Sequence, residues 1–156
     1  VSIMTIWIDA DSCPKEVRDI IVRAGIKRGV RCVFVANKRI PLPKASLIAF
    51  VKVPPGADQA DSYIEEHLVP EDLVITRDIL LAAELVQREV TVLNDRGEVF
   101  TKENIGEKVS LRNISLKFRQ NGLLDDRDKS FGKKEVKAFA DTFDRELTRK
   151  LKKRKT

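Results

Sequence analysis

The sequence has few of the side chains that bind zinc or form disulfides. Its 156 residues include one histidine and two cysteines. A structural zinc centre needs four closely spaced ligands, mostly nitrogen or sulfur, and His67, Cys13 and Cys32 do not provide such a set. Two separated cysteines also give no disulfide framework. The sequence therefore argues against a zinc enzyme and predicts a reducing, cytoplasmic environment.

Long hydrophobic runs are also missing. A helix that spans a bilayer needs about 20 consecutive apolar residues, and no run in this sequence approaches that length. The first apolar segment, Ile3 to Ile8, is too short for a signal peptide and runs into Asp9 and Asp11. With 42% hydrophobic and 35% charged residues, the composition is ordinary for a soluble globular protein. We expect no membrane partner.

Most of the chain has no excess of either charge. The net charge is +6, and residues 145–156 hold seven basic side chains and one acidic side chain. The other 23 basic and 23 acidic residues cancel. We therefore divide the chain into one domain, residues 1–148, and a basic tail, residues 149–156. Such a tail attracts phosphate backbones whatever their sequence, but a solvated, fraying helix end explains it equally well.

Apolar strands alternate with amphipathic helices through the first two thirds of the chain. Predicted strands cover residues 3–8, 31–36, 47–53, 72–76 and 90–93, and predicted helices cover 14–28, 58–68 and 78–88. A short extended piece, 98–101, and two polar helices, 104–121 and 133–153, follow; either Ser12 or Cys13 is expected to cap the first helix. The alternation predicts an α/β fold with a doubly wound, mostly parallel sheet of about five strands, helices on both faces and a helical C-terminal segment.

Acidic residues follow four of these predicted strands. Asp9 follows the first strand, Asp58 the third, Asp78 the fourth and Asp95 the fifth. Parallel strands end at the same edge of a sheet, which is where ligands bind in this fold class. The four carboxylates are therefore expected to converge. Two more acids stand close to them in the sequence, namely Asp11 and Asp61.

Each acid also has a structural explanation. Aspartate is a favoured N-cap, which suits Asp58 and Asp78, and Asp95 stands in an Asn-Asp-Arg-Gly turn where aspartate is common. Asp9 and Asp11 differ, because they place two negative charges together at one strand end. Clustered carboxylates raise one another's pKa unless a cation compensates them.

Oxygen ligands of this kind favour Mg²⁺ or Mn²⁺ over zinc. Such ions bridge phosphate oxygens and activate water, so the sequence predicts hydrolysis of a phosphate ester or phosphodiester. Polar residues predicted at the same edge are candidates to bind the phosphate, although each is also explained as an ordinary surface residue. They are Asn37, Lys38, Thr76, Arg77 and Arg96, with Arg112 and Arg119 on a later helix.

Five segments together resemble one family of bacterial proteins of unknown function, the YaiI/YqxD family. They are IWIDADSCP (6–14), PPGADQADSYI (54–64), DLVITRDILLAAE (72–84), NDRGEVFT (94–101) and FADTFDREL (139–147). The resemblance covers nearly the whole chain, and although each motif is short, the combination is specific.

The resemblance implies a PIN-like domain, because the family is placed in the PIN-like superfamily, whose nucleases hold divalent metal with a cluster of acids. It implies Asp9 as the first-strand acid, Asp58 and Asp61 as the mid-chain acids and Asp78 as the acid after the fourth strand. Asp95 follows as a further acid. One departure is the neutral body of this chain, where a nuclease would often show a basic substrate channel.

Three functions fit these observations. The first is a Mg²⁺- or Mn²⁺-dependent nuclease that acts on RNA more readily than on DNA, with Asp9 and Asp78 catalytic and all six aspartates as candidate ligands. The second is a phosphatase of the haloacid dehalogenase type, with Asp9 as nucleophile and Asp11 as acid and base. The third is a non-catalytic module that binds nucleic acid or a protein partner. A homodimer is compatible with each.

Overall fold

A six-stranded sheet forms the centre of the computed structural model, which describes residues 4–56, 58–122 and 131–155. The strand order is β3-β2-β1-β4-β5-β6, parallel except for β6, which runs antiparallel to β5. The strands are β1 (Thr5–Asp9), β2 (Arg31–Ala36), β3 (Ile48–Lys52), β4 (Leu73–Ile75), β5 (Thr91–Leu93) and β6 (Val99–Phe100). The predicted α/β class is confirmed, and β6, predicted only as an extended piece, adds a sixth strand.

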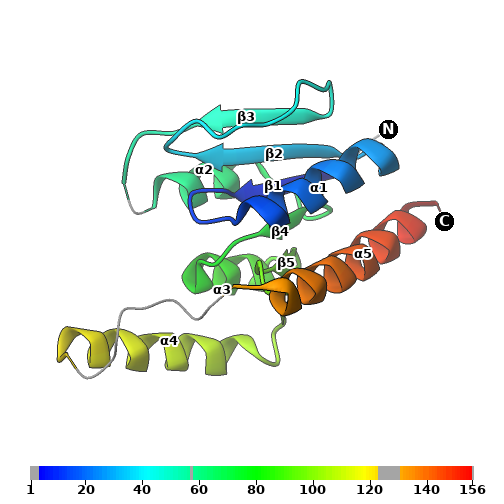
Figure 1. Ribbon diagram of the computed structural model, residues 1–156. Helices are drawn as coiled ribbons and strands as arrows, with labels where there is room; N and C mark the ends of the chain where they lie inside the picture. The colour runs from blue at the N-terminus through cyan, green and yellow to red at the C-terminus, as the bar shows by residue number, and fades with distance from the viewer. Residues whose placement is uncertain (1–3, 57, 123–130, 156) are drawn as a thin grey trace.

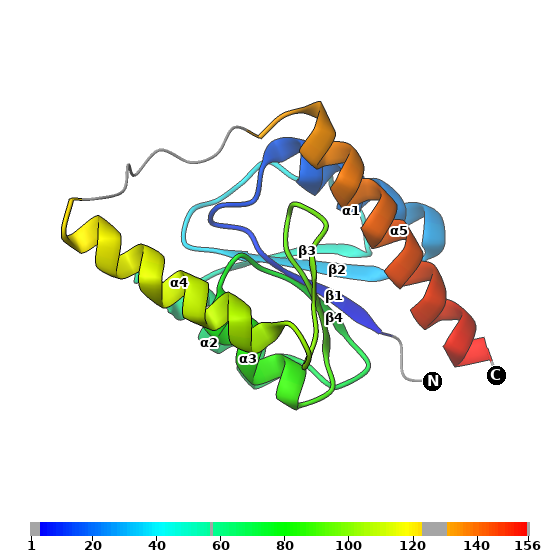
Figure 2. The same cartoon turned by 90° about the horizontal axis from the view of Figure 1, so that it is seen from below.

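Helices cover both faces of the sheet (Figures 1 and 2). They are α1 (Lys15–Arg28), α2 (Gln59–His67), α3 (Ile79–Gln87), α4 (Ile105–Gln120) and α5 (Lys133–Lys155). The α1 and α5 helices lie on one face, α2 and α3 lie on the other, and α4 packs against α3. The predicted cap of α1 is wrong, because the N-cap position is Pro14 and no side chain caps the helix. None of these helices, within the described residues, is long and apolar enough to cross a membrane.

The central strands are apolar on both faces because both faces are covered. On one face, Ile8 and Phe34 pack with Phe139 and Phe143 of α5. On the other face, Trp7 packs among apolar residues of α2 and α3. This burial explains why the strands appear in the sequence as continuous hydrophobic runs.

The β5–β6 turn fixes the start of α5. Gly97 in this turn has a φ of 83°, and a Cβ added to it would lie 2.5 Å from the carbonyl oxygen of Ala138. Only glycine allows the two backbones to approach so closely. Residues 1–3, 57, 123–130 and 156 lie outside the described residues, and these include the predicted start of the first strand at Ile3 and the last residue of the basic tail.

The amino ends of the strands are tied together by Asp72, which directly precedes β4. Its buried carboxylate accepts hydrogen bonds from the Thr5 backbone N–H at 2.9 Å, the Trp7 indole N–H at 2.8 Å and the Val69 backbone N–H at 3.0 Å. Burial of a carboxylate is costly unless its oxygens are hydrogen-bonded. Asp72 therefore has a structural role at the edge opposite the predicted site.

The strand order places a switch point between β1 and β4. From β1 the chain crosses to β2 and β3 on one side, while β4 leads to β5 and β6 on the other. In open α/β sheets the crevice for a ligand lies at this reversal, beyond the carboxyl ends of the strands. Asp9 ends β1, and Thr76 directly follows β4, so both stand at the predicted crevice.

Candidate functional site

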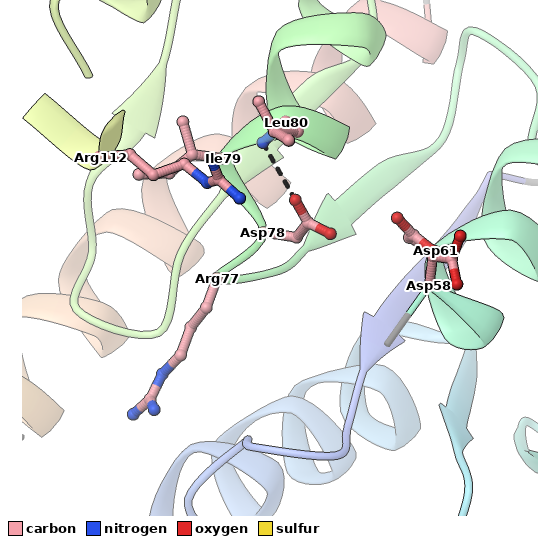
Figure 3. Close-up of a pocket in the computed structure, with 7 residues that line it drawn as sticks. All are labelled: Asp58, Asp61, Arg77, Asp78, Ile79, Leu80 and Arg112. Carbon is pink, nitrogen blue, oxygen red and sulfur yellow. Dashed lines mark hydrogen bonds between the residues drawn. The ribbon is translucent and has the colours of Figure 1, made fainter. Parts of the chain in front are cut away.

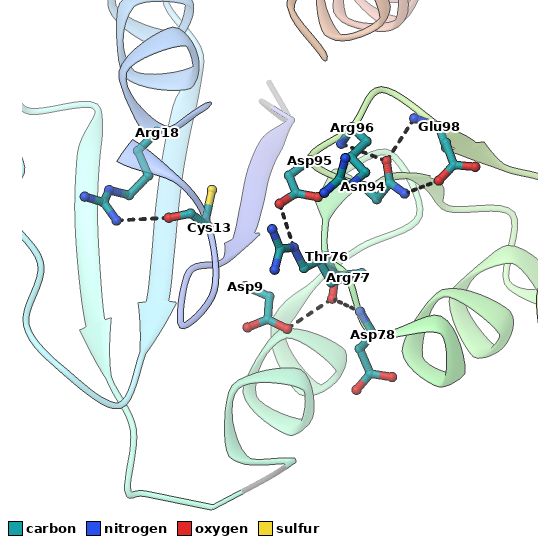
Figure 4. A network of polar contacts seen from close by, with 10 residues as sticks. All are labelled: Asp9, Cys13, Arg18, Thr76, Arg77, Asp78, Asn94, Asp95, Arg96 and Glu98. Carbon is teal, nitrogen blue, oxygen red and sulfur yellow. Dashed lines mark hydrogen bonds and ion pairs between the residues drawn. The ribbon is translucent and has the colours of Figure 1, made fainter. Parts of the chain in front are cut away.

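One hydroxyl group connects the ends of β1 and β4 (Figure 4). The Thr76 Oγ1 donates a hydrogen bond to Asp9 Oδ2 at 3.0 Å and accepts one from the Asp78 backbone N–H, also at 3.0 Å. The side chain of Thr76 is buried. Thr76 was predicted to bind phosphate, which stays a prediction; in the structure its hydroxyl bridges the Asp9 carboxylate and the Asp78 backbone.

The Asp78 carboxylate caps helix α3. Its Oδ1 accepts hydrogen bonds from the backbone N–H groups of Leu80 at 3.0 Å and Leu81 at 3.1 Å. The predicted N-cap is therefore confirmed. These bonds occupy one oxygen and leave Oδ2 without a role in the cap, so capping and ligand binding are compatible in this side chain.

Asp61 faces Asp78 from helix α2 (Figure 3). Its Oδ1 is shielded from solvent and has no hydrogen-bond partner among the residues described. Burial raises the pKa of Asp61 to about 6, and the nearby Asp78 carboxyl and, to a smaller extent, Asp58 also raise it. Asp58 occupies the N-cap position of α2 but makes no capping bond with its side chain, so its carboxylate is not committed to the helix.

These acids line a hollow of about 620 Å³. Its lining residues are Asp58, Asp61, Arg77, Asp78, Ile79, Leu80 and Arg112. The acids come from α2 and the start of α3, whereas Arg112 comes from α4. The hollow therefore places carboxylates and guanidinium groups around one space, an arrangement that suits a cation together with an anionic substrate. Sequence reasoning missed Ile79 and Leu80, which enter the lining because they follow Asp78 at the start of α3.

Asp9 is held beside this hollow with a raised pKa. Burial is the largest cause, and the negative charges of Asp11 and Asp78 add to it, while the hydrogen bond from Thr76 acts in the opposite direction. The negative charge of Asp78 thus disfavours the ionisation of Asp9. A bound cation would remove that cost.

Asp95 and Asp11 have other immediate partners. Asp95 is buried, and its Oδ2 accepts a hydrogen bond from Arg77 Nε at 2.6 Å (Figure 4). Asp11 is exposed and accepts a hydrogen bond from the Asn37 backbone N–H at 2.7 Å. Neither acid lines the hollow, so the structure brings Asp58, Asp61 and Asp78 together there and leaves Asp95 and Asp11 at its margins.

The predicted phosphate-binding residues are dispersed. Arg77 and Arg112 line the hollow, whereas Asn37, Lys38 and Arg119 do not. The Arg96 guanidinium lies over the Phe131 ring, 5.3 Å from its centroid. Arg112 was considered only as a secondary candidate from the sequence, because its distance along the chain from the acids gave no sign that α4 packs beside α3.

A hard divalent cation fits the donors of this site. Within residues 4–56, 58–122 and 131–155, no three acidic, histidine or cysteine side chains stand close enough together to hold one ion as they are placed. The available donors are nevertheless all carboxylates, the preferred ligands of Mg²⁺ and Mn²⁺, and Asp61 offers an oxygen without a partner. Asp9, Asp61 and Asp78 are the side chains that would hold the ion.

Comparison with known proteins identifies relatives along almost the whole chain. Residues 7–149 match the family model described as "Uncharacterized BCR, YaiI/YqxD family". A UPF0178 protein of Psychromonas ingrahamii is 47% identical over 92% of this chain and 95% of its own length. The UPF0178 protein of Myxococcus xanthus is 46% identical over 96% of this chain and 97% of its own length. That of Treponema pallidum is 42% identical over 95% of this chain and 84% of its own length. No solved structure matches the chain.

Proposed function

Because the chain belongs to the uncharacterised YaiI/YqxD family, whose description names no activity, we propose a function from its site: a divalent-metal-dependent nuclease. The proposed reaction is the hydrolysis of a phosphodiester bond at the switch point of the sheet, with RNA as the favoured substrate. We also propose that the domain is PIN-like, as the resemblance of its sequence motifs implies.

The observation that carries the proposal is the set of opposed carboxylates between β1, α2 and α3. Asp9 and Asp78 are linked through Thr76, and Asp61 approaches Asp78 with one oxygen that has no partner among the described residues. Burial, together with neighbouring carboxylates, raises the pKa values of Asp9 and Asp61, and this supports the proposal because a bound cation would offset that cost. A site for a cation accounts for all of these features.

The side chains of the site have distinct roles in this proposal. Thr76 orients the Asp9 carboxylate and accepts a hydrogen bond from the Asp78 backbone, while the N–H groups of Leu80 and Leu81 orient the Asp78 carboxylate. Arg112 lies across the hollow and binds a phosphate oxygen pair, as its planar guanidinium permits. When bound, Mg²⁺ or Mn²⁺ supplies the positive charge that allows a phosphate to enter an acidic site, and it favours attack by water.

The direct test is cleavage of a labelled single-stranded RNA of about 20 nucleotides, a length that exceeds one binding site of this size. We expect cleavage with Mn²⁺, its loss in EDTA and its return when Mn²⁺ is restored. A matched single-stranded DNA determines whether RNA is preferred.

Two other results would contradict the nuclease proposal. RNA binding without cleavage, in the presence of Mg²⁺ or Mn²⁺, would support the non-catalytic module. Hydrolysis of a simple phosphate monoester, with a beryllium fluoride adduct at Asp9 and no RNA cleavage, would support the phosphatase.

Replacement of Asp61 by asparagine should stabilise the metal-free protein near pH 8. The pKa of Asp61 rises from 3.8 to about 6 on folding. The protonated carboxyl therefore stabilises the folded protein at a pH below 3.8, and this stabilisation is lost as the pH rises through about 6 and is absent at higher pH. With an allowance for solvent screening, the D61N variant should gain about 1 kcal/mol, or about 3 °C in melting temperature. The difference should vanish near pH 4.

Saturating Mn²⁺ should reverse this order, because the metal stabilises the wild-type protein and binds weakly to D61N. Glu66→Gln is the matched control, since it removes the same charge from an exposed position on the same helix. If D61N and the wild-type protein have the same melting temperature near pH 8, both with and without Mn²⁺, then Asp61 is not a ligand.

A further inference from the structure

A second hollow, of about 510 Å³, lies at the opposite edge of the sheet. Its lining residues are Pro70, Glu71, Glu89, Thr91, Arg149, Lys150 and Lys153. The first four precede or begin β4 and β5, so they mark the amino ends of the strands. The three basic residues come from the last turns of α5, which runs along the sheet and brings them to this edge (Figure 2).

Arg149 is oriented by a buried acid on its own helix. Its Nε and Nη2 donate hydrogen bonds to Glu146 Oε1 at 3.2 and 2.5 Å. The Glu146 side chain is only 10% exposed, whereas that of Arg149 is 58% exposed. The guanidinium group is therefore held in one orientation while much of it remains accessible to a ligand.

Lys150 is a half-buried cation without a close counterion. It forms no hydrogen bond or ion pair with any part of the chain that the structure describes. Burial, followed by the charge of Arg149, lowers its pKa, while the negative charges of Asp72 and Glu71 act in the opposite direction. The buried acid nearby, Asp72, already accepts three N–H hydrogen bonds. On the rim of the hollow, Glu89 is paired with Lys102 at 2.5 Å. An anion at this position would compensate Lys150.

The positive surface continues on the other side of α5. The Arg28 guanidinium, at the end of α1, donates a hydrogen bond to Thr148 at 3.1 Å and is paired with Asp144 at 3.5 Å, whereas Arg31 is exposed at the start of β2. We call Arg28, Arg31, Arg149, Lys150 and Lys153 the basic edge. The acidic site thus lies at one edge of the sheet, while cations from the basic tail gather with Arg28 and Arg31 at the other.

We propose that the basic edge binds the phosphate backbone of a nucleic acid, as a second contact outside the acidic site. The inference extends the proposed nuclease function, because a cluster of carboxylates repels the phosphates of its own substrate. Affinity must then come from positive charge elsewhere on the surface. In a chain whose body is neutral, most of this positive charge is supplied by the basic tail, residues 149–156.

A phosphate backbone fits the basic edge better than a lipid surface does. A helix that lies on a membrane presents its apolar face to the lipid. The large apolar residues of α5, Phe139, Phe143 and Leu147, are instead buried against the sheet. The exposed side chains at this end of the helix are charged and have no apolar surface beside them. Such a surface suits the phosphate backbone of a nucleic acid.

The double variant K150Q/K153Q tests this inference, with K133Q/K134Q at the other end of α5 as the matched control. Binding of the labelled RNA is measured in EDTA over a range of salt concentrations, so that cleavage does not interfere. We expect K150Q/K153Q to bind about tenfold more weakly at low salt. The slope of the logarithm of the binding constant against the logarithm of the salt concentration should become shallower by about 1.4, because each of the two lost phosphate contacts contributes about 0.7. The control should bind like wild type.

Equal losses in the two variants, or no loss in K150Q/K153Q, would overturn the inference, and so would binding to vesicles rich in phosphatidylserine without binding to RNA. Circular dichroism verifies that both variants are folded. Binding through the basic edge without any cleavage would refute the nuclease proposal alone. Cleavage with unchanged binding by K150Q/K153Q would refute the second contact alone.

Discussion

Replacement of Asp9 by asparagine should lower the rate of RNA cleavage about 1000-fold. Asp9 ends β1 at the switch point, and its carboxylate opposes that of Asp78 in a partly buried site. Asparagine keeps the size of the side chain and one oxygen that accepts the Thr76 hydrogen bond, but it lacks the charge that holds a divalent cation. The measurement is the single-turnover rate with saturating Mn²⁺.

Asp19→Asn is a matched control for this variant, because it removes the same charge from an exposed pair with Lys15 on α1. We expect D19N to cleave at the wild-type rate. D9N should also melt no lower than wild type without metal, since a carboxylate with a raised pKa disfavours folding in its ionised form. Wild-type cleavage by D9N would exclude the acidic site as the catalytic centre.

Replacement of Asp72 by alanine should destabilise the protein by about 4 kcal/mol and lower its melting temperature by about 10 °C. The change leaves the backbone N–H groups of Thr5 and Val69 and the indole N–H of Trp7 without their acceptor. Two of these donors are in buried residues of β1, where water cannot replace the carboxylate. Urea unfolding, followed by circular dichroism, measures the loss.

The neighbouring substitution Glu71→Ala provides the comparison. Glu71 is exposed, so its removal should change the free energy of unfolding by less than about 0.5 kcal/mol. A D72A protein within about 1 kcal/mol of wild type would mean that the three N–H groups find other acceptors. In that case Asp72 would not be the group that ties β1 to the start of β4.

The fold was predictable because the central strands are buried on both sides. An uninterrupted apolar run such as Ile6 to Ile8 is not expected in a strand with one face exposed to solvent. Helices that alternate with such runs therefore predict a parallel sheet that is covered on both faces. The same reasoning located Asp9, Asp58 and Asp78 at one edge. The sixth strand was predicted only as an extended piece, because β6 has two residues and is too short to form an apolar run.

Contacts between distant side chains were not predictable in the same way. Asp72 and Trp7 are separated by 65 residues, and Thr76 and Asp9 by 67. Their pairing depends on the register of β1 against β4, which the apolar pattern does not specify. Asp95 illustrates the same limit, since the sequence placed it at the correct edge but did not reveal that Arg77 occupies its carboxylate.

The position of α5 also has a consequence for biosynthesis. Phe139, Phe143 and Leu147 complete the core on one face of the sheet, yet they are translated after every strand. A nascent chain that has released only its strands and the earlier helices therefore leaves the part of that face that α5 covers exposed to solvent. Such a chain is prone to aggregation, so the last helix must leave the ribosome before the core on that face can close.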